Sequence, residues 1–159
     1  MCIRDRASTA NLLLDLDQVG DLRFDERFNL TGGEDTLFTR QLVARGGTIV
    51  WCDEAVVVDH IRVSRLSRHW VLQRHFSAGN SSSICTVELQ RGGPSRLAAR
   101  VKGTGLGVAR IAAGLLRAGY GWVSGSLRHR ARGMRTAARG LGMTAGAWGG
   151  IYTEYRRHT

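Results

Sequence analysis

The residues with the clearest chemical potential are two acids, Glu34 and Asp35, which directly follow the glycine pair Gly32 and Gly33. Apolar residues recur at helical spacing over 37–43, which predicts a helix that begins near Glu34 and holds both acids in its first turn. Free backbone N–H groups and the helix dipole favour an ionised carboxylate there, and glycine lets the backbone approach a ligand without a Cβ in the way. An ionised carboxylate beside open space is what a general base needs.

Two interpretations of the acidic pair stay open on spacing alone. Adjacent side chains on a helix diverge by about 100°, so we expect one acid rather than both to do chemistry. Acids also occur in the first turn of a helix simply because they stabilise its N-terminus. The pattern is therefore typical of a general base and equally of a structural cap.

The elements that must position these acids follow from short apolar and β-branched runs. Such runs predict strands at 10–14, 48–52 and 55–58. Ser67 is a good N-cap for a helix that runs toward Leu89. The order strand, helix, strand, strand, helix predicts the later half of an α/β or mixed-sheet domain.

The positive charge lies entirely in the second part of the chain. The 159 residues carry a net charge of +10, yet residues 1–90 hold 12 acidic and 10 basic side chains. Residues 91–159 hold 13 basic side chains and one acid, Glu154, together with 15 of the 21 glycines. We expect the break at Gly92-Gly93-Pro94 to separate a folded segment, 7–90, from a basic tail.

Composition also narrows the classes of partner. A hydrophobic content of 43% excludes a wholly disordered chain, and three scattered cysteines are too few for a disulfide framework or a zinc site. The charge indicates an anionic partner, which can be nucleic acid, anionic lipid or a phosphorylated substrate.

The tail predicts two helices that differ in character. Arg110 and Arg117 interrupt the apolar stretch 105–123. The free energy needed to insert two arginines into a bilayer exceeds what the aliphatic side chains of this stretch gain there, so we expect no single membrane span. The second helix carries Arg128, Arg132, Arg135 and Arg139 on one face. This pattern fits a basic amphipathic helix on an anionic membrane surface, and also a solvated face packed on the domain. Because the tail aromatics lie near its apolar stretches, nucleic acid is not an expected partner.

The motifs of the first part resemble the family 2 glycosyltransferases, more narrowly their bacterial exopolysaccharide and succinoglycan-type members. The likeness covers residues 8–82, and segment 145–155 resembles their C-terminal end more loosely. The segments that carry it are Phe24-Asp25-Glu26-Arg27-Phe28, Gly32-Gly33-Glu34-Asp35, Arg45-Gly46-Gly47-Thr48-Ile49-Val50-Trp51-Cys52, Glu54-Ala55-Val56-Val57-Val58, Arg65-Leu66-Ser67-Arg68-His69-Trp70 and Arg74-His75-Phe76-Ser77-Ala78-Gly79-Asn80-Ser81.

The resemblance implies an α/β fold: the C-terminal part of a GT-A domain, a Rossmann-like mixed sheet, followed by basic amphipathic helices. It implies an inverting hexosyltransferase that moves a sugar from a nucleotide-sugar to a glycan or lipid-linked acceptor. Such an enzyme would take part in the synthesis of bacterial surface polysaccharide or exopolysaccharide. It would be a peripheral protein at the cytoplasmic face of the inner membrane. By position, Asp35 is the base that deprotonates the acceptor hydroxyl, Glu34 supports it or orients the acceptor, and Gly32 and Gly33 belong to the substrate site.

A second group of candidate residues comes from the same resemblance. Arg65, Arg68 and Trp70 lie where processive relatives carry a Gln/Arg-x-x-Arg-Trp motif, although here His69 is inserted before the tryptophan. Arginine binds phosphate oxygens and tryptophan stacks on a sugar face, whereas a surface helix with ordinary arginines is the alternative. His60, at the end of the last predicted strand, is either a ligand of the diphosphate or metal, or a structural residue.

The family also implies a divalent metal, Mg²⁺ or Mn²⁺, held by an Asp-x-Asp motif. That motif should lie well upstream of Asn11, so we expect it to be missing from this chain and interpret Asp15 and Asp17 as turn or cap residues. Residues 1–6 resemble a translated sequencing-adapter sequence, which predicts a non-native leader on a C-terminal fragment that is inactive alone.

Two other classes of protein stay open. One is a small basic module that binds anionic lipid or nucleic acid through residues 91–159. The other is a purely structural fragment without a site.

Overall fold

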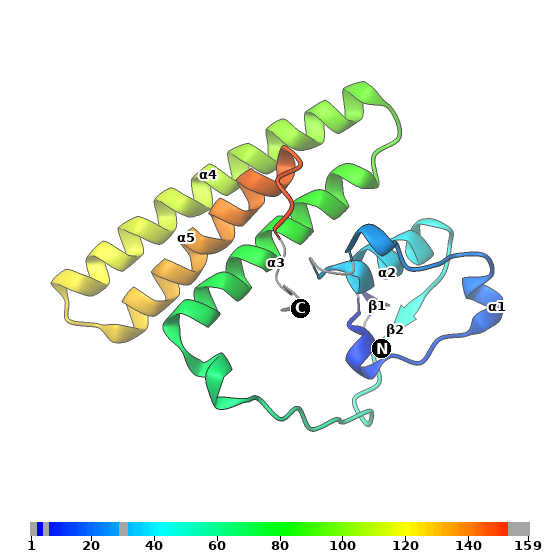
Figure 1. Ribbon diagram of the computed structural model, residues 1–159, viewed down its shortest axis with the longest axis horizontal. Helices are drawn as coiled ribbons and strands as arrows, with labels where there is room; N and C mark the ends of the chain where they lie inside the picture. Colours follow the sequence, from blue (N-terminus) through cyan, green and yellow to red (C-terminus); the bar gives the residue numbers. More distant parts are fainter. Residues whose placement is uncertain (1–2, 5–6, 29–31, 153–159) are drawn as a thin grey trace, which may run out of the picture.

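The computed structural model describes residues 3–4, 7–28 and 32–152. Short elements form a small N-terminal part, and three long helices lie side by side beyond an extended segment (Figure 1). The N-terminal elements are β1 (Ile3–Arg4), η1 (Thr9–Asn11), α1 (Leu16–Val19), η2 (Glu26–Phe28), α2 (Glu34–Ala44) and β2 (Ile49–Val50). The later elements are η3 (Val63–Leu66), α3 (Arg68–Glu88), α4 (Gly93–Val123) and α5 (Leu127–Ala147).

The predicted mixed sheet is wrong. Among the described residues, the strand pairing consists of β1 and β2, antiparallel, with Ile3 opposite Val50. The expected strands at 10–14 and 55–58 lie outside any ladder, and Leu13 and Val56 are 97% and 79% exposed. An apolar or β-branched run becomes a strand only when a neighbouring segment pairs with its backbone, which local pattern does not specify. A mainly helical architecture therefore replaces the α/β, GT-A-type fold expected from the sequence.

The predicted starts of the helices near Glu34 and at Ser67 are confirmed, as is the interpretation of Asp15 as a cap residue. α2 begins at Glu34, directly after Gly33, whose φ of 103° is left-handed. Ser67 caps α3, where its hydroxyl accepts a 3.2 Å hydrogen bond from the backbone N–H of Trp70. Asp15 caps α1 in the same way, accepting from the backbone N–H of Asp17 at 3.0 Å.

Two apolar clusters hold the N-terminal part together and dock it on the helices. Val19, Leu22, Phe38 and Leu42 join α1 to α2. A second cluster, Phe28, Leu37 and Cys85, joins η2 and α2 to α3. α2 is thereby fixed against the second half of α3.

Glycines at seven-residue spacing bring α4 and α5 into close contact. Seven residues are nearly two helical turns, so Gly107, Gly114 and Gly121 share one face of α4. An added Cβ on Gly114 would lie 2.7 Å from the carbonyl oxygen of Gly133, and one on Gly140 would lie 2.6 Å from that of Gly107. Part of the glycine enrichment after residue 90 thus serves the packing of these two helix backbones.

The close packing leaves many larger apolar side chains of α4 on the surface. Val101, Val108, Leu115 and Trp122 recur every seven residues and are all more than half exposed. No helix in the described part of the chain has the length and apolar character needed to cross a membrane.

Candidate functional site

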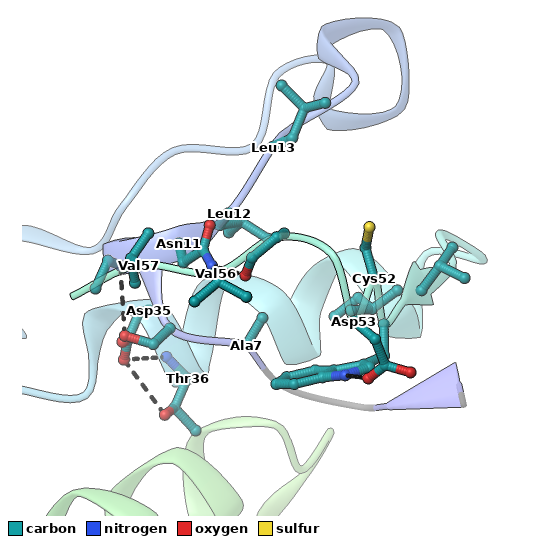
Figure 2. Close-up of a pocket in the computed structure, with 16 residues that line it drawn as sticks. Ala7, Asn11, Leu12, Leu13, Asp35, Thr36, Cys52, Asp53, Val56 and Val57 are labelled. Atoms are coloured by element: carbon teal, nitrogen blue, oxygen red, sulfur yellow. Dashed lines mark hydrogen bonds between the residues drawn. The ribbon is translucent and has the colours of Figure 1, made fainter. Parts of the chain in front are cut away.

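The Asp35 side chain lines a cavity of about 970 Å³ in the N-terminal part. The walls come from the start of the described chain, the first turn of α2, and the extended stretch from β2 to residue 57. Figure 2 shows Asp35 and Thr36 on the opposite side of this cavity from Cys52 and Asp53. The structure thus places the predicted general base at a space large enough for a small-molecule ligand, for which about 300–1,000 Å³ is usual.

The hydrogen bonds of Asp35 involve one carboxylate oxygen. Oδ1 accepts from the backbone N–H of Thr36 at 2.7 Å and from the Thr36 hydroxyl at 3.4 Å. Oδ2 receives no hydrogen bond from the described residues, and Asp35 is half-buried. One oxygen is therefore held in place while the other is available to a ligand.

The cavity is apolar apart from a few polar groups. Trp51 is 54% exposed at its wall, and its indole N–H donates to Asp53 at 2.5 Å. The side-chain nitrogen of Asn11 donates a 2.6 Å hydrogen bond to the carbonyl oxygen of Ala55, which connects two walls of the cavity. No basic side chain is among the described residues that line the cavity, so it does not supply the cations that a diphosphate needs.

The glycine pair lies against α3. Gly33 lies against α3, where an added Cβ would be 2.7 Å from the Cβ of Ser81. The Ser81 hydroxyl donates to the Gly32 carbonyl at 2.8 Å, and the Cys85 thiol donates to the Gly33 carbonyl at 3.7 Å. In this structure the two glycines allow the loop before α2 to dock closely on α3.

Glu34 differs from its neighbour in having a side-chain oxygen that is both buried and without a described hydrogen-bond partner. Its Oε2 atom is buried and has no hydrogen-bond partner among the described residues. Glu34 is absent from the described lining of the Asp35 cavity, consistent with divergence of adjacent side chains on a helix. The two acids therefore do not converge on one point.

The second group of predicted site residues lies at the other end of α3. Arg68 and Ser81 are 13 residues apart on this helix, which corresponds to about 20 Å. The Arg65 guanidinium lies 5.8 Å from the ring centroid of Trp70, and His60 is exposed on the extended segment before η3. The structure does not bring these four residues to the cavity of Asp35.

A buried amide near the glycine pair went unnoticed in the sequence. Asn80 is 1% exposed and donates from its side-chain nitrogen to the carbonyl of Gly150 at 2.6 Å. Its side-chain oxygen accepts from the backbone N–H of Tyr152 at 3.3 Å, and Phe76 meets the Tyr152 ring edge-on at 5.1 Å. Segment 150–152 is thus fastened to α3 one residue before Ser81. The sequence signal for this contact is an asparagine within a run of small residues, 77–83 of α3, where a second segment can pack closely on the helix.

The described residues do not fit a divalent metal. They contain no group of three or more His, Cys, Asp or Glu side chains that could hold an ion. Asp15-Leu16-Asp17 has the letters of the expected Asp-x-Asp motif. Its first carboxylate accepts hydrogen bonds from the backbone N–H of Asp17 and the side chain of Gln18, within its own turn. We therefore derive no step through a metal.

Comparison with known proteins gives one distant relationship. No protein-family profile matches the chain, and no solved structure matches it. The chain is 34% identical over 86 residues to the succinoglycan biosynthesis protein ExoM of Rhizobium meliloti (strain 1021). The match covers 53% of this chain and 28% of that protein, so the chain spans less than a third of its relative's length. This similarity supports the succinoglycan-type resemblance at a distance and does not assign the chain to family 2.

Proposed function

We propose that this chain is part of a glycosyltransferase of exopolysaccharide synthesis, with Asp35 as the general base. The observation that carries the proposal is the half-buried Asp35 carboxylate at the wall of a cavity of about 970 Å³, with Oδ2 unoccupied by the described residues. The distant similarity to a succinoglycan biosynthesis protein supports the substrate class.

The proposed reaction is an inverting transfer from a nucleotide-sugar. An acceptor hydroxyl gives its proton to Oδ2 of Asp35 as its oxygen forms a bond to the anomeric carbon. The bond from that carbon to the diphosphate breaks at the same time, and the nucleoside diphosphate leaves with the electron pair. Thr36, which donates twice to Oδ1, keeps the carboxylate oriented during the transfer.

The cavity is better suited to the acceptor than to the donor. Trp51 brings an aromatic ring, of the kind that packs against sugars, to the wall of this cavity, and Asp53 adds a polar edge. The lack of basic lining residues in the described part argues against a diphosphate in the same place. The other predicted site residues remain proposed contributors to the transfer reaction: Glu34, His60, Arg65, Arg68 and Trp70. The cations that stabilise the diphosphate leaving group come from outside this cavity.

We also propose that the α4–α5 pair lies on an anionic membrane surface, where a lipid-linked acceptor would be found. The exposed apolar row of α4 and the arginines of α5 are the two components of an interfacial helix pair. Co-sedimentation with anionic and with neutral vesicles tests this location. Equal recovery with both kinds of vesicle contradicts it.

The test of the catalytic proposal uses the protein expressed from its complete reading frame. Transfer of radiolabelled sugar from a panel of nucleotide-sugars to bacterial lipid extract is measured for the wild type, Asp35→Asn and Asp53→Asn. Loss of a general base lowers kcat by about 10²–10⁴-fold, so Asp35→Asn should fall in that range. Asp53→Asn removes a carboxylate from the same cavity and should retain activity within about tenfold. Equal transfer by Asp35→Asn and the wild type removes Asp35 as the base.

A further inference from the structure

A second cavity, of about 470 Å³, lies between α4 and α5 beside α3. We call it the arginine cleft. Its lining includes His75 of α3, Arg110 and Arg117 of α4, and Arg132, Arg135 and Arg139 of α5. Its volume falls within the range of about 300–1,000 Å³ usual for small-molecule sites.

The glycine packing explains why arginines from two helices meet. Arg110 follows Gly107 by three positions, and Arg117 has the same place relative to Gly114. These arginines flank the face of α4 that packs on α5, because residues three apart are neighbours on a helix. Close approach of the two backbones therefore places them beside the arginines of α5, seven residues apart at Arg132 and Arg139.

The charges in the arginine cleft are not neutralised by the part of the chain that the structure describes. None of its five arginines has an ion pair or side-chain hydrogen bond with another described residue. α4 and α5 contain no acidic residue. Crowding like charges without a counter-charge destabilises the folded state, and a bound anion would offset that cost.

The environment of His75 agrees with a strongly positive cleft. Burial lowers the pKa of this imidazole, and the positive charges of Arg135 and Arg139 lower it further. A neutral imidazole at the wall offers one N–H donor and one acceptor, which complements the fixed donors of the guanidinium groups.

We propose that the arginine cleft binds a phosphate or diphosphate group, carried either by a lipid or by a free small molecule. Guanidinium groups match phosphate oxygens bidentately, and several of them suit a multivalent anion better than a single carboxylate. No Phe, Tyr or Trp side chain is among the described residues that line the cleft, so it lacks the large aromatic rings on which nucleic-acid bases stack. The site is separate from the cavity of Asp35 and does not depend on the proposed transfer reaction.

Inorganic pyrophosphate is the first probe, titrated into the full chain by isothermal calorimetry with sulfate as the reference anion. The variants are Arg135→Gln/Arg139→Gln in the cleft and Arg128→Gln/Arg130→Gln on the same helix outside it. The cleft variant loses charge-assisted hydrogen bonds to the anion, so it should bind pyrophosphate at least about tenfold more weakly. The outer variant removes the same charge and should bind as the wild type does.

Vesicles distinguish the two sources of the phosphate group. A lipid-borne phosphate predicts stronger binding to phosphatidic acid than to phosphatidylserine vesicles of equal surface potential, lost in the cleft variant and competed by pyrophosphate. A free ligand predicts pyrophosphate binding without that vesicle preference. Circular dichroism establishes that the variants keep their helices, and Arg110→Gln/Arg117→Gln tests the same cleft from α4. If the outer variant Arg128→Gln/Arg130→Gln weakens pyrophosphate binding as much as the cleft variant does, or if neither pyrophosphate nor phosphatidic acid binds, the proposal is overturned.

Discussion

The Ser81 hydroxyl on α3 donates a 2.8 Å hydrogen bond to the carbonyl oxygen of Gly32, two residues before the acidic pair begins its helix. The same serine lies so close to Gly33 that an added Cβ would be 2.7 Å from the Ser81 Cβ. The loop that positions Asp35 is therefore held by α3, a helix some fifty residues further along the chain. This contact couples the cavity of the N-terminal part to the helices.

Replacing Gly33 by alanine should destabilise the protein more than replacing Gly46. Both glycines have a similar left-handed φ, 103° and 96°. Of the two, only Gly33 has an atom of another residue within 4 Å of the position that an added Cβ would take. The shared backbone strain costs about 1–2 kcal/mol, and overpacking against Ser81 adds about 1–3 kcal/mol in Gly33→Ala. Urea unfolding measures both. If the two variants lose equal stability, the loop does not dock on Ser81 as described.

The cysteines should differ sharply in their reaction with iodoacetamide. Cys52 is exposed, whereas Cys85 is 0% exposed and burial raises the pKa of its thiol to about 11. At about pH 8 only about one thiol in a thousand would then be ionised at Cys85. Peptide mapping should find Cys52 alkylated in the native protein and Cys85 only after unfolding. The Gly33→Ala variant should label faster at Cys85, since α2 and α3 separate more readily.

Two glycines of α4 should respond to alanine in opposite directions. Gly119 has open space around it, so Gly119→Ala should stabilise the helix by about 0.5–1 kcal/mol. Gly114 packs against the backbone of α5, and Gly114→Ala should cost about 1–3 kcal/mol because the helices must separate. Thermal unfolding followed by circular dichroism checks both. A stabilising Gly114→Ala would contradict the close packing of α4 and α5.

Stability should decrease at acidic pH through His75. Burial and the charges of Arg135 and Arg139 lower the pKa of His75 from its ordinary 6.5. The unfolded chain therefore binds more protons than the folded one just below pH 6.5, so the free energy of unfolding decreases as the pH falls through that region. His75→Gln should show a weaker decrease in urea titrations at a series of pH values. An identical pH dependence in both proteins would contradict this.

Local signals predicted the helices and the acidic pair correctly because their causes are local. Ser67 caps its helix by accepting a hydrogen bond from the backbone N–H of Trp70, three residues later. Asp15 caps its helix by accepting one from the backbone N–H of Asp17, two residues later. The strands at 10–14 and 55–58 were wrong because a strand depends on a partner elsewhere in the chain. The placement of Asp35 at a cavity agrees with the general-base hypothesis, whose chemistry stays a prediction.

The amino-acid sequence by itself determined the helix starts, the position of Glu34 and Asp35 in a first helical turn, and the concentration of positive charge after residue 90. Only the tertiary structure decided that Gly33 packs on Ser81, that the tail glycines join two helix backbones, and that arginines of α4 and α5 share one cleft. Capping and charge are properties of neighbouring residues, whereas close approach and charge convergence depend on how distant segments pack.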